Sequence, residues 1–595
     1  MRIHFILIAI FYGVIELAGQ ATYPKAIKAE IKQVENNLAG RIKIDGKGYN
    51  IRDRMAHYKV KGLSMAVVRN YKVIWAKGYG WADEKEKRPV TTETLFKPGS
   101  ISKSLNALGA LKLVQGNQLE LHKDINSYLK SWQFPYDSLS KGGKITLAHL
   151  LSHTAGISVY GGFPGYNKDS KIPSIPDILD GKEPANTPPV RSLFEPGLQF
   201  QYSGGGTIIS QLMITDVSHQ GYEKFMYGSV LKPLGMTQSF YSAAPPAGDQ
   251  LKKIATGYTK EGVEVDATFR VYPEQAPLGL WTTPTDLCHY LIEAQLAYQG
   301  KSAKVLHQEM ARLHLTPYID ANATLGAFVQ ERNGVKYFFH DAGNEGYRGL
   351  YFASIEDGDG VVILVNSDEG EIILEVLNSV ASVYNWKGFD KPASVYTKEI
   401  SKTLEEKYVG VYLYEGKIAA VTRKQDGLYF WTAGQDVKMY FTSDKEFINI
   451  EFPAIKSFLT DTAGNVLGYS RKLNGVEYPP AMKVAKVDTI LANAGELNYF
   501  GWHLLETKRL DEAIQYLSRG IETEPNDVNI KVNLAHCYLF KNEYAKAIQL
   551  YKAYLAQKSD DESTLKSVIK QDFDFFLKNG FDKALMQKAS TELML

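Results

Sequence analysis

Short runs in which hydrophobic and polar residues alternate lie near both ends of the segment from residue 25 to 388. Leu63–Val68 and Val73–Tyr79 predict a β-hairpin. Three more runs predict strands at the far end: Lys336–His340, Leu350–Ser354 and Val361–Asn366. Between the two ends, apolar residues recur at helical spacing, as at Leu105 and Leu108. This order predicts an α+β fold, in which distant segments form one antiparallel sheet and a helical lobe is inserted between them.

Two different patterns follow this segment. From residue 395 to 487, short alternating runs are separated by turn signals such as Asp426-Gly427, which predicts a small all-β sandwich or barrel. From residue 490 to 595 the pattern is helical, and Glu512-Ala513-Ile514 recurs as Lys546-Ala547-Ile548, 34 residues later. That period is typical of tetratricopeptide repeats, so we expect a pair of such repeats and a closing helix around Leu565–Leu577. An unrelated helical hairpin is the alternative.

Composition excludes several classes of protein. The 595 residues include 68 Lys and Arg and 66 Asp and Glu, a formal net charge of +2. Such a balance argues against sequence-independent binding of nucleic acid, which needs a basic surface. The two cysteines, Cys288 and Cys537, lie almost half the chain apart. They cannot form a disulfide framework or a Cys-rich zinc site, and we expect two free thiols.

The first 21 residues have the composition of a secretory signal peptide. Arg2 and His4 precede an apolar run, Phe5–Ile15, and small residues such as Ala18 and Ala21 follow. The run is short for a membrane span, so we expect cleavage and a secreted or periplasmic protein. A retained N-terminal anchor is the alternative. No later stretch approaches 18 uninterrupted apolar residues, so no transmembrane segment is expected in the mature chain.

A Ser-x-x-Lys tetrapeptide, Ser100-Ile101-Ser102-Lys103, is the strongest candidate for chemistry. The same spacing recurs at Ser127, Ser138, Ser229 and Ser567. Only Ser100 follows a Phe96–Gly99 turn and begins a predicted helix, on which Lys103 would lean back toward the Ser100 hydroxyl. Burial and the positive helix start lower a lysine pKa, and a neutral amine can accept the serine proton. We therefore predict a nucleophile and its base. A capped helix with a solvated lysine is the alternative.

Four sequence blocks occur in an order that a known family shares. They are Phe96–Lys103, Ile145–Gly156, Tyr202–Gly204 and Pro233–Met236. Over roughly residues 45–385 the chain resembles serine hydrolases similar to class C β-lactamases and penicillin-binding proteins. The resemblance implies a β-lactamase/transpeptidase-like fold, an acyl-enzyme on Ser100, and no metal or organic cofactor.

The family's second motif, Tyr-x-Asn, corresponds to Tyr202-Ser203-Gly204. The resemblance implies that Tyr202 lies near Lys103 and relays protons between Ser100 and the leaving group. A tyrosine needs a cationic neighbour for this at neutral pH, because its reference pKa is about 10. Gly204 replaces the amide that would contact an acyl group, so we expect substrate to be positioned differently here.

The third motif, Lys-Thr-Gly, is absent by name, and His340-Asp341-Ala342-Gly343 occupies its place. The resemblance implies that His340 donates a hydrogen bond to the substrate or to Tyr202, and that Asp341 and Ala342 lie against the substrate. A histidine is a weaker and pH-dependent cation, which weakens the case for β-lactam recognition. The backbone N–H groups of Ser100 and Gly343 would form the oxyanion hole.

Two other chemistries lack support. His149 and His153 are four residues apart, but the glutamate of a His-Glu-x-x-His zinc motif is missing, so we assign both a structural role. No Gly-x-Ser-x-Gly sequence surrounds any serine, which weakens an α/β-hydrolase interpretation.

The sequence therefore predicts an exported serine hydrolase, carboxypeptidase- or esterase-like, that acts on an ester, amide or D-amino-acid-type peptide. A protein or peptide partner is expected on the helical repeats. A non-catalytic binding scaffold that keeps the hydrolase fold is the main alternative, and a true β-lactamase is a weaker one. The physiological substrate is left open.

Overall fold

A computed structural model describes residues 23–159, 162–244, 246–265, 268–432, 434–451, 454–473, 475–484, 492–555 and 562–595. The expected signal peptide, residues 1–21, lies outside the described residues. The chain divides into two compact units. The first contains the residues up to Gly40 together with Gly48–Pro392, and the second contains Arg41–Lys47 and Ala393–Leu595.

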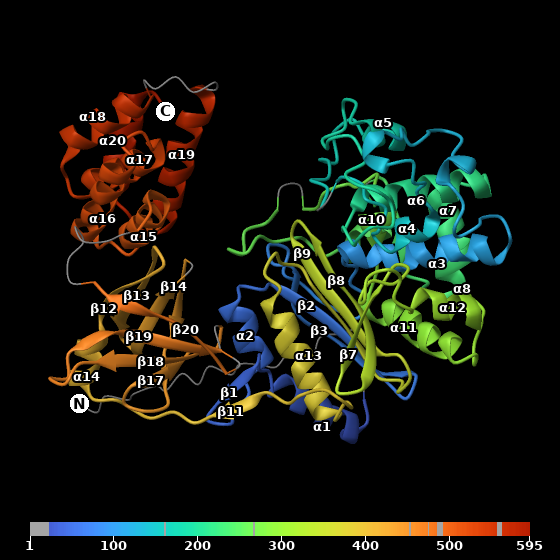
Figure 1. Cartoon of the computed structure of the whole chain (residues 1–595), viewed down its shortest axis with the longest axis horizontal. Helices are drawn as coiled ribbons and strands as arrows, with labels where there is room; N and C mark the ends of the chain where they lie inside the picture. The colour runs from blue at the N-terminus through green and yellow to red at the C-terminus, as the bar shows by residue number, and fades with distance from the viewer. Residues whose placement is uncertain are drawn as a thin grey trace, which may run out of the picture. The chain divides into compact units, whose positions relative to one another are not determined.

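One antiparallel sheet organises the first unit (Figure 1). Its seven strands are, in sheet order, β4 (Arg88–Pro89), β3 (Lys72–Asp83), β2 (Gly62–Arg69), β10 (Gly360–Val365), β9 (Tyr347–Ser354), β8 (Val335–Asn344) and β7 (Phe328–Arg332). The predicted hairpin is formed by β2 and β3, and β2 also pairs with β10, where Leu63 lies opposite Val365. Distant segments thus close a single sheet, which confirms the predicted fold class.

Helices cover both faces of this sheet, which explains why its central strands are almost continuously apolar. On one face, α1 (Lys25–Glu35), α2 (Ile51–His57) and α13 (Glu371–Val383) share a hydrophobic core with β2 and β10 (Figure 1). The other face packs against the helical lobe. As a result, the first seven residues of β2 are all buried.

The lobe occupies the chain between β4 and β7. It contains the helices α3 (Ser102–Gln115), α4 (Leu147–Leu151), α5 (Ile175–Asp180), α6 (Gly204–Ser218), α7 (Tyr222–Met226), α8 (Lys232–Leu234), α9 (Asp249–Lys253), α10 (Gln275–Leu278), α11 (Pro284–Tyr298) and α12 (Gln308–His314), the short turns η1 (Gly99–Ile101), η2 (Ile125–Ser127), η3 (Ser138–Ser140) and η4 (Tyr227–Leu231), and the ribbon of β5 (Phe240–Tyr241) and β6 (Leu280–Trp281).

The second unit includes a short segment from the N-terminal part of the chain, Arg41–Lys47, which the sequence did not predict. Strand β1 (Ile42–Ile44) pairs in parallel with β11 (Ala393–Val395), and Asp45 accepts hydrogen bonds from Thr397. Residues 41–47 therefore belong to this unit, although the hydrophobic pattern predicts one unbroken domain from 25 to 388. A three-residue strand carries too little pattern to reveal a partner that is hundreds of residues away.

A nine-stranded antiparallel sheet forms the β module of this unit. After α14 (Lys402–Tyr408), its strands are, in sheet order, β15 (Gln435–Lys438), β14 (Gly427–Thr432), β13 (Lys417–Lys424), β12 (Gly410–Tyr414), β20 (Val476–Lys483), β19 (Val466–Leu473), β18 (Ile455–Thr460), β17 (Glu446–Ile448) and β16 (Tyr440–Phe441). The edge strands β15 and β16 are consecutive in the chain, and the side-chain amide of Asn449, directly after β17, donates to the Lys438 carbonyl of β15. The sheet is therefore nearly closed, as in a barrel rather than a sandwich.

Among the residues that the structure describes, six helices follow the β module: α15 (Ala494–Glu506), α16 (Leu510–Thr523), α17 (Val528–Phe540), α18 (Tyr544–Leu555), α19 (Glu562–Lys578) and α20 (Lys583–Leu593). The helices α15 and α17, which open two successive hairpins, begin at residues 494 and 528, which keeps the 34-residue period. The predicted closing helix is thus half of a third hairpin, because α20 follows it. The ring centroids of Trp431 in the β module and Phe500 in α15 are 4.7 Å apart, so the sheet and the helical repeats share a core.

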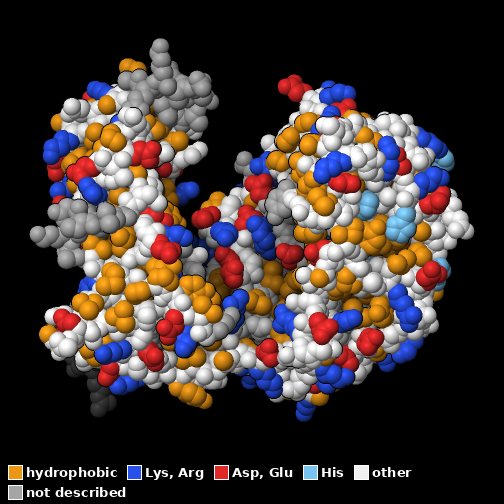
Figure 2. Space-filling view, viewed as in Figure 1, with side chains coloured by type: hydrophobic (Ala, Val, Ile, Leu, Met, Phe, Trp, Pro, Cys, Tyr) orange, Lys and Arg blue, Asp and Glu red, His pale blue; other side chains and the backbone are white. Residues whose placement is uncertain are grey.

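Surface and thiol properties agree with the composition. On the face seen in Figure 2, Lys and Arg side chains are interspersed with Asp and Glu. Cys288 and Cys537 are buried free thiols, as predicted. Within the described part of the chain, none of the helices is both long and apolar enough to cross a membrane.

Candidate active site

Ser100 lies in the short turn η1, directly before helix α3. The turn is held because the Ser102 hydroxyl donates to the Gly99 carbonyl at 2.6 Å. Lys103 is on the first turn of α3, and its Nζ lies 3.0 Å from Ser100 Oγ. The three-residue spacing thus brings the two side chains together, with Ser100 half-buried and Lys103 only 4% exposed.

The environment of Lys103 suits a base. Burial lowers the pKa of its amine to about 7, and the negative charge of Asp341 opposes part of that shift. The Nζ also donates to the Pro277 carbonyl at 3.3 Å, which fixes its direction. Near neutral pH, a large fraction of Lys103 is therefore unprotonated and able to accept a proton from Ser100.

Tyr202 completes a cluster of three groups around the serine oxygen. Its hydroxyl donates to Ser100 Oγ at 2.9 Å, and Lys103 Nζ lies 5.0 Å from its ring centroid. Tyr202 is fixed by the start of α6, since the Ser203 hydroxyl caps that helix by accepting from Gly206 N at 3.0 Å. The cap explains why a Tyr-Ser pair precedes the glycines.

His153 packs against the ring of Tyr202, a role that sequence reasoning missed. The two ring centroids are 4.2 Å apart, at an interplanar angle of 31°. His153 Nδ1 accepts from Ser203 N at 3.2 Å, so one buried histidine contacts both residues. The only available signal was its place in the Ile145–Gly156 block. His149 instead closes a capping box with Thr146, and the described residues contain no group of three potential metal ligands.

His340, on β8, is 2% exposed, and its Nδ1 lies 2.6 Å from the backbone oxygen of Asp341. A carbonyl oxygen can only accept, so Nδ1 carries the proton and Nε2 of the neutral ring is an acceptor. Burial, together with the nearby Lys103, lowers the pKa of His340 to about 4. The donor role implied by the family resemblance would therefore require protonation, which this environment disfavours.

The backbones of Gly99 and Gly343 lie against each other. Gly99 has a φ of +52°, and a Cβ there would lie 2.8 Å from the Gly343 oxygen and 3.0 Å from its nitrogen. Only glycine allows this approach. It brings the turn of Ser100 beside the strand of Gly343, as an oxyanion hole made of their two N–H groups requires.

A cavity of about 200 Å³ opens onto this cluster. Its described lining residues are Ser100, Lys103, Gly162, Phe163, Tyr202, Leu278 and Gly343. Phe163 comes from a loop and Leu278 from the end of α10, and the sequence offers no motif at either position.

Four residues expected to contact substrate are not among the described residues that line this cavity: His340, Gly204, Asp341 and Ala342. Gly204 is buried, and its N–H donates to the Val159 carbonyl at 3.1 Å. On β8 the buried Ala342 faces the core, whereas Asp341 is 83% exposed.

Polar contacts hold the helix of the nucleophile from behind. Ser104 of α3 donates to the Gly326 carbonyl at 2.7 Å and lies 2.8 Å from the Tyr351 hydroxyl.

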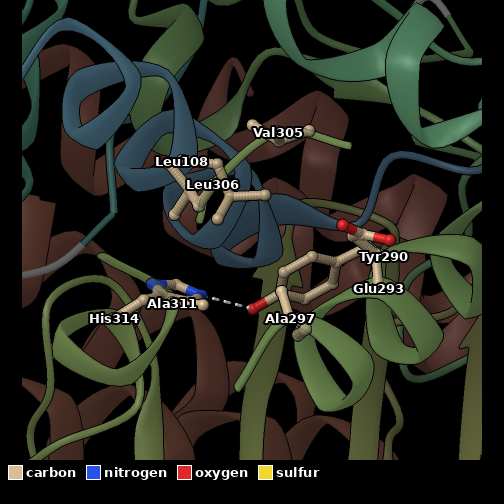
Figure 3. Close-up of a pocket in the computed structure, with 9 residues that line it drawn as sticks. Leu108, Tyr290, Glu293, Ala297, Val305, Leu306, Ala311 and His314 are labelled. Carbon is tan, nitrogen blue, oxygen red and sulfur yellow. Dashed lines mark hydrogen bonds between the residues drawn. The ribbon is translucent and has the colours of Figure 1, made fainter. Parts of the chain in front are cut away.

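Figure 3 shows Tyr290 hydrogen-bonded to His314 beside a small void. The Tyr290 hydroxyl lies 2.8 Å from His314 Nε2, and the void has a volume of about 10 Å³. Such a volume holds at most one water, so this void is a packing defect rather than a ligand site.

Comparisons with known proteins agree with this geometry. Residues 49–375 match the β-lactamase family model, and residues 504–571 match a tetratricopeptide repeat model, which indicates a protein-interaction module. The chain is 26% identical over 425 residues to penicillin-binding protein 4* of Bacillus subtilis, covering 65% of this chain and 90% of that protein. It is 26% identical over 351 residues to protein flp of Staphylococcus aureus, covering 56% of this chain and 66% of that protein.

A solved structure shares the fold. The octameric penicillin-binding protein homologue from Pyrococcus abyssi aligns with a TM-score of 0.50 and 20% identity, over 73% of this chain and 98% of that one. That likeness concerns the fold alone. The family model, however, matches more than half of the chain, and this protein therefore belongs to the β-lactamase family of penicillin-binding-protein-like serine hydrolases.

Proposed function

We propose that this protein is a serine hydrolase that forms an acyl-enzyme on Ser100 with an ester, an amide or a D-amino-acid-type peptide. One observation carries the proposal: Ser100 Oγ lies 3.0 Å from Lys103 Nζ and 2.9 Å from the Tyr202 hydroxyl, at the wall of a cavity. A serine hydroxyl is a weak nucleophile until a base takes its proton, and this arrangement provides one.

The reaction would run in two halves. Ser100 Oγ bonds to the substrate carbonyl carbon while its proton passes to Lys103 Nζ, and the carbonyl electron pair moves onto oxygen, where the N–H groups of Ser100 and Gly343 stabilise it. When the intermediate collapses, the bond to the leaving group breaks, and Tyr202 passes a proton to the departing oxygen or nitrogen. Water then attacks the acyl group by the same route and releases the acid. Neither half needs a metal or an organic cofactor.

The nucleophile can be tested by labelling. A fluorophosphonate or penicillin-type probe should modify the protein at Ser100, and Ser100→Ala should abolish the labelling. Ser138→Ala is the matched control, because Ser138 has the same Ser-x-x-Lys spacing but is exposed on η3. Full labelling of Ser100→Ala, or loss of labelling in Ser138→Ala alone, would contradict the assignment.

Turnover separates this proposal from a binding scaffold. A hydrolase releases product over many cycles from a panel of esters and D-amino-acid peptides, whereas a scaffold binds them stoichiometrically. Hydrolysis of nitrocefin at the rate of its best ester would instead favour a true β-lactamase. The same preparation serves all three measurements.

We also propose that the enzyme is exported and that its helical repeats bind a protein or peptide partner. The composition of residues 1–21 supports export, and the tetratricopeptide match supports a partner. Mass spectrometry of the mature protein tests export, since cleavage near Ala21 removes the apolar run, whereas an intact N-terminus would contradict cleavage.

A further inference from the structure

We propose that the site selects small acyl donors that carry no carboxylate beside the scissile bond, so that neutral esters and amides are preferred over their anionic counterparts. This inference rests on the proposed acyl-enzyme function and narrows its substrate class. It follows from which charges face the cavity, which groups are already paired, and what forms the walls.

A substrate carboxylate that leaves water needs a cation or several donors to hold it. Among the described residues that line the cavity, Lys103 is the only basic side chain, and it is committed to Ser100 and to the Pro277 carbonyl. The neutral form that accepts the Ser100 proton carries no charge. Lys103 therefore cannot serve as base and hold an anion at the same time.

His340 is not among the described residues that line the cavity, and in its neutral form it adds no positive charge near it. Its one ring N–H donates to the backbone oxygen of Asp341, at 2.6 Å, so the other nitrogen presents a lone pair. The low pKa of the ring keeps it neutral at physiological pH.

The charged groups near Gly343 disfavour the binding of an anion. Asp341, 83% exposed on the same strand, adds a negative charge that is felt at both Lys103 and His340. Arg348 lies opposite Gly343, but its Nη1 is 2.8 Å from the Asp368 carboxylate and also donates to two backbone carbonyls.

A second arginine near the strand is paired as well. Arg270 forms an ion pair with Glu345, which is two residues beyond Gly343. Its Nε lies 2.8 Å from the Glu345 carboxylate. Both arginines are thus matched with carboxylates of the protein itself.

The walls favour short apolar groups. Phe163 and Leu278 face the cavity, and its volume of about 200 Å³ lies below the roughly 300–1,000 Å³ of sites for drug-sized ligands. Gly204 provides no side-chain amide to bind a peptide-like acyl group. A small acyl group can therefore bind through the apolar walls and the two backbone N–H groups alone.

Matched esters test this inference. Phenyl acetate and meta-acetoxybenzoate share an acetyl group and differ by one carboxylate on the leaving group. We expect kcat/KM for the neutral ester to exceed that for the anionic ester by about tenfold or more, equivalent to about 1.4 kcal/mol. Phenyl butyrate and the monophenyl ester of succinate repeat the comparison with the carboxylate on the acyl side. Only turnover that Ser100→Ala abolishes is counted.

Three variants locate the cause. His340→Lys places a cation where the neutral ring lies and should reduce the neutral-to-anionic ratio about tenfold. Asp341→Asn removes only an exposed charge and should change the ratio by about threefold or less, because solvent screens such charges. Arg348→Gln should leave the ratio unchanged, since that arginine is committed to Asp368.

The outcomes separate the two proposals. Absence of Ser100-dependent turnover of every ester would overturn the proposed function and this inference with it. Equal or faster turnover of the anionic esters would overturn the inference alone. So would a rise of the ratio in Arg348→Gln, because that arginine would then be a carboxylate receptor.

Discussion

One buried lysine from each unit, Lys103 and Lys456, can be compared, and the two are alike in burial and in the direction of their pKa shift. Lys103 in the first unit is 4% exposed and Lys456 in the β module is 3% exposed. Burial lowers the pKa of the first to about 7 and that of the second to about 8. A perturbed lysine pKa is therefore not by itself a mark of a functional site.

Their neighbours make the difference. Lys456 donates to the Asn449 side chain at 3.0 Å and lies between the rings of Phe430 and Phe447 in the core of the sheet. Lys103 lies next to two hydroxyls, those of Ser100 and Tyr202, at a cavity. Chemistry requires a group that can give up a proton and space for a substrate, and only Lys103 has both.

Exchanging each lysine for methionine gives the largest contrast. Lys103→Met should lower kcat/KM for the preferred ester by about 10²–10⁴-fold, the usual contribution of a general base. Lys456→Met should leave kcat/KM unchanged and lower the free energy of unfolding of the second unit by about 1–3 kcal/mol, because Asn449 Oδ1 loses its donor. Ester kinetics and thermal melts measure the two effects. An active Lys103→Met, or an inactive but folded Lys456→Met, would reverse the comparison.

The next effect concerns the backbone beside Lys103. Gly99→Ala would force a methyl group against the backbone of Gly343 at a positive φ, so the oxyanion donors must separate. We expect kcat/KM to fall by about 10²-fold or more. Gly228→Ala is the control, because a Cβ there meets nothing within 4 Å. Equal activity of the two variants would show that the close approach is not needed.

Local pattern predicted the parts of the site that lie close together in sequence. Ser100 and Lys103 share one helix turn, so their contact follows from spacing, and Tyr202 followed from its motif. Contacts between segments that are distant in the sequence were not predictable in this way. The cavity walls at Phe163 and Leu278, and the stacking of His153 on Tyr202, depend on how the lobe packs.

Two elements escaped prediction for a related reason. The three-residue strand Ile42–Ile44 and the helix Lys583–Leu593 lie where the hydrophobic pattern is weak or the repeat drifts from its period. The fold class, by contrast, was predictable because long strands at both ends of the lobe carry a strong pattern. More of the secondary structure than of the side-chain contacts was therefore predictable from the sequence.

The pH dependence should report Lys103 and not Lys456. The base must be unprotonated, so kcat/KM should fall about tenfold per pH unit below a midpoint near 7 and level off above it. Asp341→Asn removes a charge that raises the pKa of Lys103, so its profile should move to lower pH. The Lys456→Met profile should coincide with that of the wild type. An unchanged midpoint in Asp341→Asn would show that Asp341 does not raise the pKa of Lys103.

The smallest expected effect comes from changing His153, whose ring packs against Tyr202 beside Lys103. His153→Asn keeps a short acceptor for Ser203 N–H and tolerates the φ of +59° at this position, but it removes the stacked ring. We expect kcat to fall roughly tenfold with little change in KM or in the melting temperature, because a small displacement of Tyr202 weakens proton transfer more than substrate binding. His153→Phe keeps a ring but leaves Ser203 N–H unpaired, so it should lose about 1–3 kcal/mol of stability instead. If His153→Asn matches the wild type in kcat while His153→Phe unfolds early, the histidine serves only the fold. A loss of kcat at full stability would instead identify His153 as a positioning residue, with no equivalent near Lys456.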